Sequence, residues 1–450
     1  MQEPHPLELS IGMENYSTSF QGVGGVLKSR YEDFIVEEID ARQEVAAADI
    51  SLDAPCIDNE EMNIEGVARK SRNIHFTLQK MGLTTLDAAS LVAASLRISR
   101  HMVTYAGLKD KRALTAQRMS VPKSALDSLK ELDLSRVWIR NLTYSRRPIN
   151  IGDLWGNQFR ILLREMDATC EEALEIIENL RSQPLLNYFG IQRFGVSRPF
   201  THLVGKAVVK NDFEEAIQLI LTTPSEYEPV QIRDIRNRIR DEGLSEAIIE
   251  ELPQDLSYER LVAKSLLRHP EDFKLAFSKT PPRIQTLFVH AYQSYLFNRI
   301  LSRRFQKGMS IFTPEVGDFL IRLDSAHTGR DDWLFVTERN HASMIEKTDS
   351  GAFGLAGIIP GYASKVPNTI HSDIVREILT SEEVAVSSFR HPDNQNLDSP
   401  GGLHLLSIVL PTISGSCTEE GLEVKFKLRK GSYATVVLRE LMKNSPFNRS

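Results

Sequence analysis

The chain has 450 residues, of which 41% are hydrophobic and 25% are charged, as in soluble globular proteins with room for two or three domains. The formal net charge of -6 argues against a protein coated in basic surface, although a local basic groove could still bind phosphates. The amino-terminal stretch does not have the pattern of a signal peptide, and the longest apolar runs are too short to span a bilayer. We therefore expect a cytoplasmic protein without membrane contact.

The first third of the chain alternates strand and helix patterns. Near its start, GVGGVLKS (Gly22 to Ser29) comes close to a phosphate-binding loop, but Leu27 stands where that pattern requires glycine, and the dinucleotide pattern lacks its third glycine. We expect a turn there, and no nucleotide cofactor. Strands are then predicted over residues 33–39, 75–78, 102–107, 115–122 and 155–165. Helices are predicted over 84–97, where Thr84 and Asp87 have capping-box spacing, and over about 171–181.

The middle of the chain changes character. Residues 212–277 have a mostly helical and polar pattern broken by Pro224, Gly243 and Pro253, and a glycine-rich stretch at 351–362 closes the region. The tail returns to strand-like alternation and ends in a helix at about 433–443, for which Ser432 is the expected cap. A helical block between two mixed stretches indicates an inserted domain, so the two ends of the chain would complete one catalytic domain together.

Cysteines and histidines give no sign of a metal site. Cys56, Cys170 and Cys417 lie far apart, so neither a zinc knuckle nor a disulfide framework is indicated, and we expect three free thiols in a reducing compartment. The histidines are scattered, and His391 has no second histidine at a metal-binding spacing. No metal is expected, and the absence of a GxSxG motif removes support for a hydrolase nucleophile elbow.

One acidic residue, Asp110, is surrounded by cations in AGLKDKRALTAQ (Ala106 to Gln117). By itself such a run is typical of a solvated surface loop. Here, however, the predicted strands on both sides would make the loop short and fixed in position. The neighbouring cations favour a charged carboxylate, which could act as a nucleophile at a sugar carbon or as a base.

A second basic run follows in RVWIRNLTYSRRP (Arg136 to Pro148), with four arginines, no acid and the interleaved aromatics Trp138 and Tyr144. Cations for phosphates and aromatic faces for bases are what an RNA segment requires. A basic strand on a solvated sheet face accounts for the same composition equally well.

GLKDKRALTAQ resembles the GxKDxxAxTxQ signature of the TruD family of pseudouridine synthases. Further blocks resemble that family in the same order: LKSRYEDFIVEE from Leu27, GNQFRILLRE from Gly156, NYFGIQRFG from Asn187, AYQSYLFN from Ala291 and GSYATVVLRE from Gly431. The resemblance covers nearly the whole chain, about residues 27–441. The chain is longer than bacterial members, mainly in the middle, and in this it is similar to archaeal members.

The resemblance implies an α+β pseudouridine synthase fold with a mixed, largely antiparallel sheet, plus an inserted α/β TRUD domain. We place the catalytic domain at residues 1–186 and 386–450 and the inserted domain at 187–385. The implied activity is isomerisation of uridine to pseudouridine in tRNA, usually at uridine 13, by a monomer without cofactor, metal or energy source. The target base must leave the RNA stack to reach the aspartate.

The resemblance also implies roles for single residues, with Asp110 as the catalytic aspartate. It pairs Lys28 with that aspartate and places Phe159 against the target uracil, with Asn157 nearby. Of the remaining candidates, Phe34 lies in a family block, Lys109 and Arg112 are cations beside the aspartate, and Thr115 and Gln117 would order the loop. Arg193 would either contact phosphate or brace the domain junction. Lys28 could equally be a surface lysine, and Phe159 plain core.

Two other functions stay open at this stage. One is a non-catalytic RNA-binding or RNA-remodelling protein on the same fold, against which the intact GLKDKRA core argues. The other is a glycosidase-like hydrolase that uses Asp110 as a nucleophile, for which no acid partner is evident.

Overall fold

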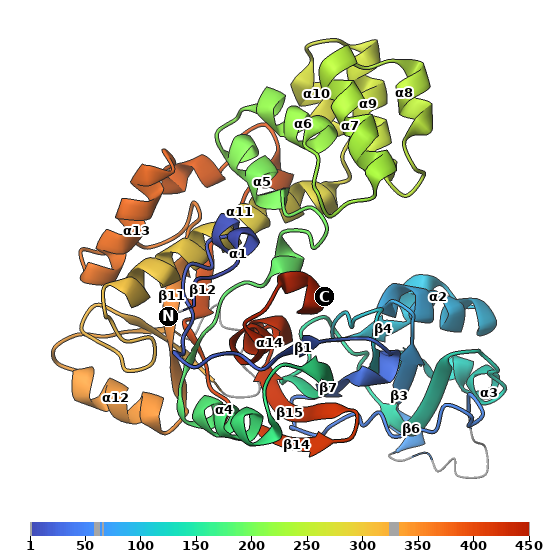
Figure 1. Cartoon of the computed structure of the whole chain (residues 1–450). Helices are drawn as coiled ribbons and strands as arrows, with labels where there is room; N and C mark the ends of the chain where they lie inside the picture. Colours follow the sequence, from blue (N-terminus) through green and yellow to red (C-terminus); the bar gives the residue numbers. More distant parts are fainter. Residues whose placement is uncertain (1, 58–63, 65–66, 324–332, 450) are drawn as a thin grey trace.

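The structure is a computed structural model, which describes residues 2–57, 64, 67–323 and 333–449 (Figure 1). The described residues form an α+β protein with two main sheets, and the predicted fold class is confirmed. The larger sheet has nine strands in the described residues, along the path β14-β15-β7-β2-β5-β3-β6, with β1 on β7 and β4 on β5. All its pairings are antiparallel except that of β2 with β5.

The strands of the larger sheet come from both ends of the chain. Those from the amino-terminal part are β1 (Gly24–Val26), β2 (Phe34–Ile39), β3 (Asn73–Met81), β4 (Thr104–Tyr105), β5 (Leu114–Pro122), β6 (Val137–Ser145) and β7 (Gly156–Met166). The tail adds β14 (Ser414–Thr418) and β15 (Gly421–Arg429), and β15 pairs along β7 from Leu163 to Gly156. The tail therefore extends the sheet that the amino-terminal part begins.

Helices cover this sheet. The capping box predicted for α2 (Thr85–Ser95) is present, because Thr84 accepts from the backbone of Asp87 and Asp87 accepts from that of Thr84. The remaining helices of this part are α3 (Leu126–Lys130), α4 (Cys170–Ser182) and α14 (Ala434–Met442). For α14 the predicted cap was wrong: the N-cap residue is Tyr433, and no side chain caps the helix.

The second sheet has the order β10-β9-β11-β12 in the described residues. Its strands are β9 (Phe319–Arg322), β10 (Trp333–Phe335), β11 (Phe353–Ile359) and β12 (Gly402–Leu405), and its neighbouring helices are α11 (Pro282–Gln306), α12 (His341–Asp349) and α13 (Ile370–Ser381). Because β12 pairs with β11, this sheet takes in residues beyond the predicted boundary after residue 385. The short pair β8 (Leu185–Leu186) and β13 (Ser407–Ile408) lies where the chain leaves and re-enters the first part.

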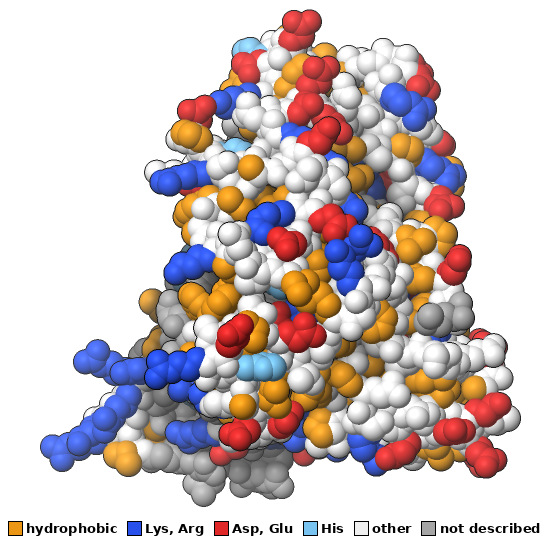
Figure 2. All heavy atoms as spheres, turned by 90° about the vertical axis from the view of Figure 1, so that its left-hand side faces the viewer, with side chains coloured by type: hydrophobic (Ala, Val, Ile, Leu, Met, Phe, Trp, Pro, Cys, Tyr) orange, Lys and Arg blue, Asp and Glu red, His pale blue; other side chains and the backbone are white. Residues whose placement is uncertain are grey.

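The predicted helical block is confirmed as a bundle at the top of Figure 1. It comprises α5 (Thr201–Val209), α6 (Phe213–Thr222), α7 (Val230–Glu242), α8 (Glu246–Glu251), α9 (Ser257–Arg268) and α10 (Phe273–Ser278). On the opposite side of the molecule from α2, the face with α12 and α13 carries acidic and basic side chains interspersed, apart from Lys and Arg side chains gathered at its lower left edge (Figure 2).

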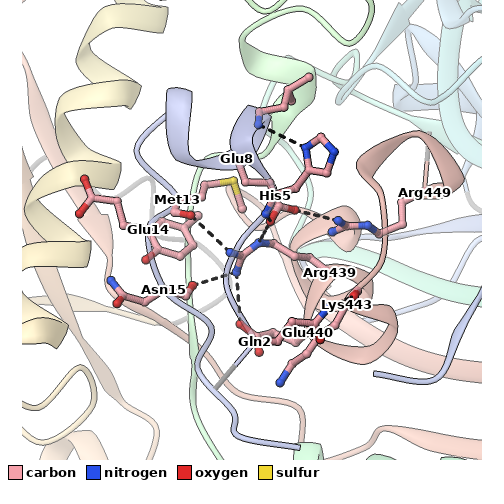
Figure 3. A network of polar contacts seen from close by, with 12 residues as sticks. Gln2, His5, Glu8, Met13, Glu14, Asn15, Arg439, Glu440, Lys443 and Arg449 are labelled. Carbon is pink, nitrogen blue, oxygen red and sulfur yellow. Dashed lines mark hydrogen bonds and ion pairs between the residues drawn. The ribbon is translucent and has the colours of Figure 1, made fainter. Parts of the chain in front are cut away.

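The amino-terminal segment, which includes α1 (Pro6–Ser10), runs between α11 and α14 (Figure 3). Buried Glu8 lies between two arginines, with Oε2 3.0 Å from Nε of Arg439 and Oε1 2.8 Å from Nη2 of Arg449. Burial opposes ionisation of Glu8, yet the two arginines hold the pKa of this carboxyl below its ordinary value. On the other side, Asn298 of α11 donates to the Ile11 carbonyl at 3.0 Å, so the segment joins the two parts of the molecule.

One cysteine prediction was wrong. Cys170, at the start of α4, and Cys417, in β14, form a disulfide, while Cys56 is a buried free thiol. The two bonded residues are 247 positions apart, and only the pairing of β14 with β15 and the packing of α4 bring them together. Sequence spacing could not reveal this.

Candidate active site

Asp110 lies in the loop that joins β4 to β5, as predicted. The two strands pair antiparallel, with Tyr105 opposite Met119, so the loop connects neighbouring strands of one sheet. The Asp110 side chain is 53% exposed, which leaves its carboxylate open to a bound molecule.

Lys28 faces this carboxylate, as the resemblance implied. Its Nζ is 3.9 Å from Oδ2 of Asp110 and 4.4 Å from the ring centre of Phe34. The lysine is buried, and burial lowers the pKa of Lys28, while the nearby Asp110 acts in the opposite direction. A buried cation therefore lies behind an exposed anion, held between a carboxylate and an aromatic face.

The backbone of Lys28 is in the left-handed region, with a φ of 56°. That conformation is unfavourable for a residue with a side chain and persists only where the surroundings fix it. Contacts on both sides do so: the Leu27 amide donates to the Asn448 carbonyl at 2.8 Å, and Nη2 of Arg112 donates to the Lys28 carbonyl at 3.3 Å. Arg112 is itself exposed, as is Lys111.

Lys109 has a different role from its neighbours. It is buried, and its Nζ is 2.6 Å from Oε2 of buried Glu38 in β2. Lys109 therefore ties the loop to the sheet and does not face the surface, whereas Lys111 and Arg112 do. The structure thus distinguishes the roles of Lys109, Lys111 and Arg112, which the sequence alone did not assign individually.

A chain of hydrogen bonds fixes the backbone on both sides of Leu108. The Thr85 hydroxyl accepts from the Lys109 amide at 2.8 Å and donates to Oε1 of Gln117 at 2.9 Å. Nε2 of Gln117 then donates to the Gly107 carbonyl at 3.0 Å. Gln117 therefore orders the loop, as the resemblance implied.

Lys80 supports Asp110 directly and was missed by sequence analysis. Its side chain is fully buried, and Nζ donates to the Asp110 carbonyl at 2.9 Å and to the Leu83 carbonyl at 2.6 Å. Burial lowers the pKa of Lys80 to about 8. In the sequence, Lys80 is simply a polar residue next to a predicted strand, which carries no signal of burial.

Register places the other candidates on one face of the larger sheet. Val36 lies opposite both Thr115 and Phe159, and Glu38 lies opposite Asn157. Directly paired residues point to the same face, and so do alternate residues of one strand. Thr115, Asn157 and Phe159 therefore share the face that carries Glu38, the partner of Lys109.

An aromatic cluster lies on this face. Phe159 is 6% exposed, stacks on Phe426 at 5.3 Å between ring centres, and meets the edge of Phe34 at 6.1 Å. Contacts thus run from Asp110 through Lys28 and Phe34 to Phe159. Phe159 is therefore part of the core, and it also lies next to Phe34, whose ring Lys28 covers.

Two buried polar atoms on this face have no hydrogen-bond partner among the described residues, Oγ1 of Thr115 and Oδ1 of Asn157. Buried polar groups are almost always paired, so such atoms call for an explanation such as a ligand. The Asn157 amide offers both a hydrogen-bond acceptor and donors, which suits a nucleobase that carries both donors and acceptors.

Other candidates lie elsewhere. Arg193, in a short 3-10 helix (Ile191–Arg193), donates from Nε to the Ser294 hydroxyl of α11 at 3.3 Å, which favours the role of bracing the junction. Trp138 of the basic run is buried, and its Nε1 donates to the Ala54 carbonyl at 3.0 Å. Trp138 therefore does not present a free face to bases, contrary to the RNA-binding interpretation of that residue.

Within the described ranges, no group of three His, Cys, Asp or Glu side chains could hold a metal ion. Nor, in those ranges, does any helix combine the length and the apolar composition that crossing a membrane requires.

Three comparisons with known proteins give the same family, and each covers nearly the whole chain. A family model described as "tRNA pseudouridine synthase D (TruD)" matches residues 10–441. Two relatives, each named "Probable tRNA pseudouridine synthase D", are 33% identical: one from Methanosarcina acetivorans, covering 99% of this chain and 98% of its own, and one from Methanosarcina barkeri, covering 100% of both. A crystal structure from Methanosarcina mazei that carries the same family name superposes with a TM-score of 0.81 at 29% identity, covering 99% of this chain and 100% of its own.

Proposed function

This chain belongs to the tRNA pseudouridine synthase D (TruD) family, and from that premise we propose that it converts uridine to pseudouridine in tRNA, at uridine 13, with Asp110 as the essential carboxylate. The observation that carries the proposal is the setting of Asp110: an exposed carboxylate 3.9 Å from a buried lysine, on a loop whose backbone Lys80 holds. A rigid carboxylate beside a cation suits the opening of a sugar–base bond.

The reaction needs no oxidant and no leaving molecule. Asp110 either attacks the ribose C1′ or removes a proton from C2′, and either route breaks the bond from C1′ to N1. The uracil turns and C5 forms the new bond to C1′. At this step the bond from Asp110 to C1′ breaks in the first route, whereas in the second route Asp110 returns the proton to C2′. The C5 proton is then lost as N1 gains one. The atoms and electrons of the nucleoside balance, so the reaction is an isomerisation.

Phe159 and Asn157 are the proposed base-contacting residues. Phe159 supplies an apolar surface at the aromatic cluster, and the unpartnered Oδ1 of Asn157 can accept the N3–H of uracil. Lys28 keeps the carboxylate in place and balances its charge while the base is free. The exposed cations Lys111 and Arg112 meet the RNA backbone.

Asp110→Asn tests the proposal. The variant should melt like the wild type and bind tRNA, because the side chain is exposed, yet it should release no tritium above background from tRNA that carries 5-tritiated uridine. Asp127→Asn is the matched control, an exposed aspartate of the same domain in α3, and should retain full activity.

Sequencing pseudouridine in tRNA treated with purified protein then fixes the position. Turnover by Asp110→Asn would remove Asp110 from its role, and pseudouridine at another uridine would correct the position alone. Tight tRNA binding by the wild type without any pseudouridine would favour the non-catalytic RNA-binding alternative.

A further inference from the structure

Two of the most exposed apolar side chains lie on the loop that carries Asp110 and on a second loop joined to it. Ile151 is 76% exposed and Leu108 is 67% exposed, and of the other large apolar side chains that the structure describes Val67 at 69% and Ile370 at 62% come nearest to them. Single exposed apolar residues are ordinary, but two of them on a pair of joined loops are not explained by packing.

The two loops are joined to each other. The Gly152 amide donates to the Ala106 carbonyl at 2.8 Å, and Ala106 packs with Ile149 and Leu154 in a small buried cluster. Leu108 follows Ala106 by two positions, and Ile151 precedes Gly152 directly. The two exposed side chains therefore lie on two loops that a backbone hydrogen bond joins, and Leu108 stands two positions before Asp110.

Each loop is held on both sides of its exposed residue. Leu108 stands between Gly107, whose carbonyl accepts from Gln117, and Lys109, whose amide donates to Thr85. Ile151 stands in a turn in which the Asn150 amide donates to Oδ2 of Asp153 at 2.8 Å and Nζ of Lys430 donates to the Gly152 carbonyl at 3.0 Å. The backbone is ordered while the two side chains stay in water, which is typical of a preorganised binding surface.

Exposed cations flank both apolar residues. Lys111 and Arg112 follow Leu108, and Arg146 and Arg147 precede Ile151 at the end of the basic run. Apolar tips between cations complement a nucleic acid, whose phosphates attract the charges and whose stacked bases accept an apolar wedge. An apolar protein partner would not call for four cations.

We propose that Leu108 and Ile151 form an apolar wedge that enters the RNA stack and occupies the space left when the target uridine turns out toward Asp110. This inference rests on the proposed function, which requires the base to leave the stack. The wedge would stabilise the opened RNA and so lower the cost of presenting the uridine. It makes these two residues determinants of activity on structured RNA, without a part in the chemistry.

The test compares two RNA substrates. One is an unmodified tRNA transcript, and the other is the same transcript with an abasic site opposite the uridine that the wild type modifies, so that opening this uridine is easier. Leu108→Ala, Ile151→Ala and the double variant are assayed for kcat/KM of pseudouridine formation on both. Ile370→Ala is the control, an equally simple loss of a 62% exposed apolar side chain on α13, at the other end of the molecule.

We expect the double variant to lose about 10- to 100-fold in kcat/KM on the intact transcript, since unstacking a base step is a cost of that order. On the abasic transcript the loss should be at least about threefold smaller, because part of that opening is already provided. All variants should melt like the wild type, because both side chains lie in solvent.

The outcomes separate the two proposals. A double variant that matches Ile370→Ala on the intact transcript, or that loses equally on both RNAs, overturns the wedge while the wild-type activity upholds the synthase assignment. A wild type that forms no pseudouridine in either RNA overturns the proposed function, and the wedge with it.

Discussion

At the scale of single residues, the buried pair of Lys109 and Glu38 is the most demanding feature of the site. Their side chains are 3% and 1% exposed, and Oε1 of Glu38 also accepts from the Arg118 amide at 3.1 Å. Removing two charges from water is costly, and mutual attraction with added hydrogen bonds offsets that cost only while both partners are present. The pair fixes the loop that carries Asp110 to β2.

Lys109→Met should therefore destabilise the protein by about 3–5 kcal/mol, because Glu38 would stay buried without its cation. The double variant Lys109→Met/Glu38→Gln should be milder, since no charge is left unpaired. Urea unfolding of both variants measures the difference. Equal losses in the single and the double variant would show that the ion pair is not the cause.

Sequence reasoning singled out Asp110 as a candidate because six blocks of residues support its motif, but it could not identify Lys80, Glu38 or Thr85 as supports of the loop. A polar residue in or beside a strand normally faces water, and nothing local marks the ones that face inward. Lys80 is buried because its ammonium reaches the Asp110 carbonyl, 30 positions away. Side-chain contacts of this kind form only after the strands have paired in the correct register.

At the scale of elements, the disulfide joins α4 to β14, the strand at one edge of the larger sheet. Cross-linking distant residues limits the freedom of the unfolded chain, more so when the closed loop is long. Here that loop includes the whole second sheet and the helical bundle.

Reduction with dithiothreitol should lower the free energy of unfolding by about 2–4 kcal/mol, and Cys170→Ser/Cys417→Ser should reproduce the loss without a reductant. Thermal melting under both conditions measures the effect. Dithiothreitol should leave the double variant unchanged, and an effect on that variant would point to Cys56 instead.

Capping residues predicted the start of a helix correctly where the full capping motif is present. The Thr84 capping box marked the start of α2, whereas Ser432 suggested a cap that α14 does not use. Strand β3 was predicted only over residues 75–78, but it runs over Asn73–Met81, because its buried polar residues, such as Gln79, break the apolar pattern. Pattern therefore located the strand but not its length.

At the scale of the whole molecule, two buried histidines make the folded protein sensitive to acid. Burial lowers the pKa of His202, in α5, to about 4, and burial reinforced by Arg304 does the same for His371, in α13. The unfolded chain binds a proton at each histidine below about pH 6.5, whereas the folded chain does so only near pH 4. Their stabilising contribution is therefore complete above pH 6.5 and is lost as pH falls toward 4.

His371→Gln should reduce the slope of unfolding free energy against pH by about 1.4 kcal/mol per pH unit between pH 6.5 and 4. Urea unfolding at several pH values measures the slope. His269→Gln, at an exposed position, is the control and should leave the slope unchanged. An identical slope in His371→Gln and the wild type would contradict the prediction.

The helical block was visible in the sequence, since its pattern interrupts two mixed stretches. The sequence pattern could not show where the chain returns to the larger sheet. Strand β12 has the same alternating character as the strands that follow it, yet it pairs with β11 of the second sheet. Which sheet receives a strand depends on tertiary packing, and one sequence does not contain that information in local form.

The joining of distant segments also sets an order on synthesis. A ribosome produces residues 24–166 long before β15, so β7 has no partner on one side until the intervening residues have emerged. The Lys28 backbone acquires its final contacts later still, because the amide of its neighbour Leu27 donates to the carbonyl of Asn448. The nascent chain therefore cannot complete the contacts that hold Lys28 opposite Asp110 before the C-terminal segment is made, and a chain that stalls earlier leaves the ribosome without the assembled candidate site.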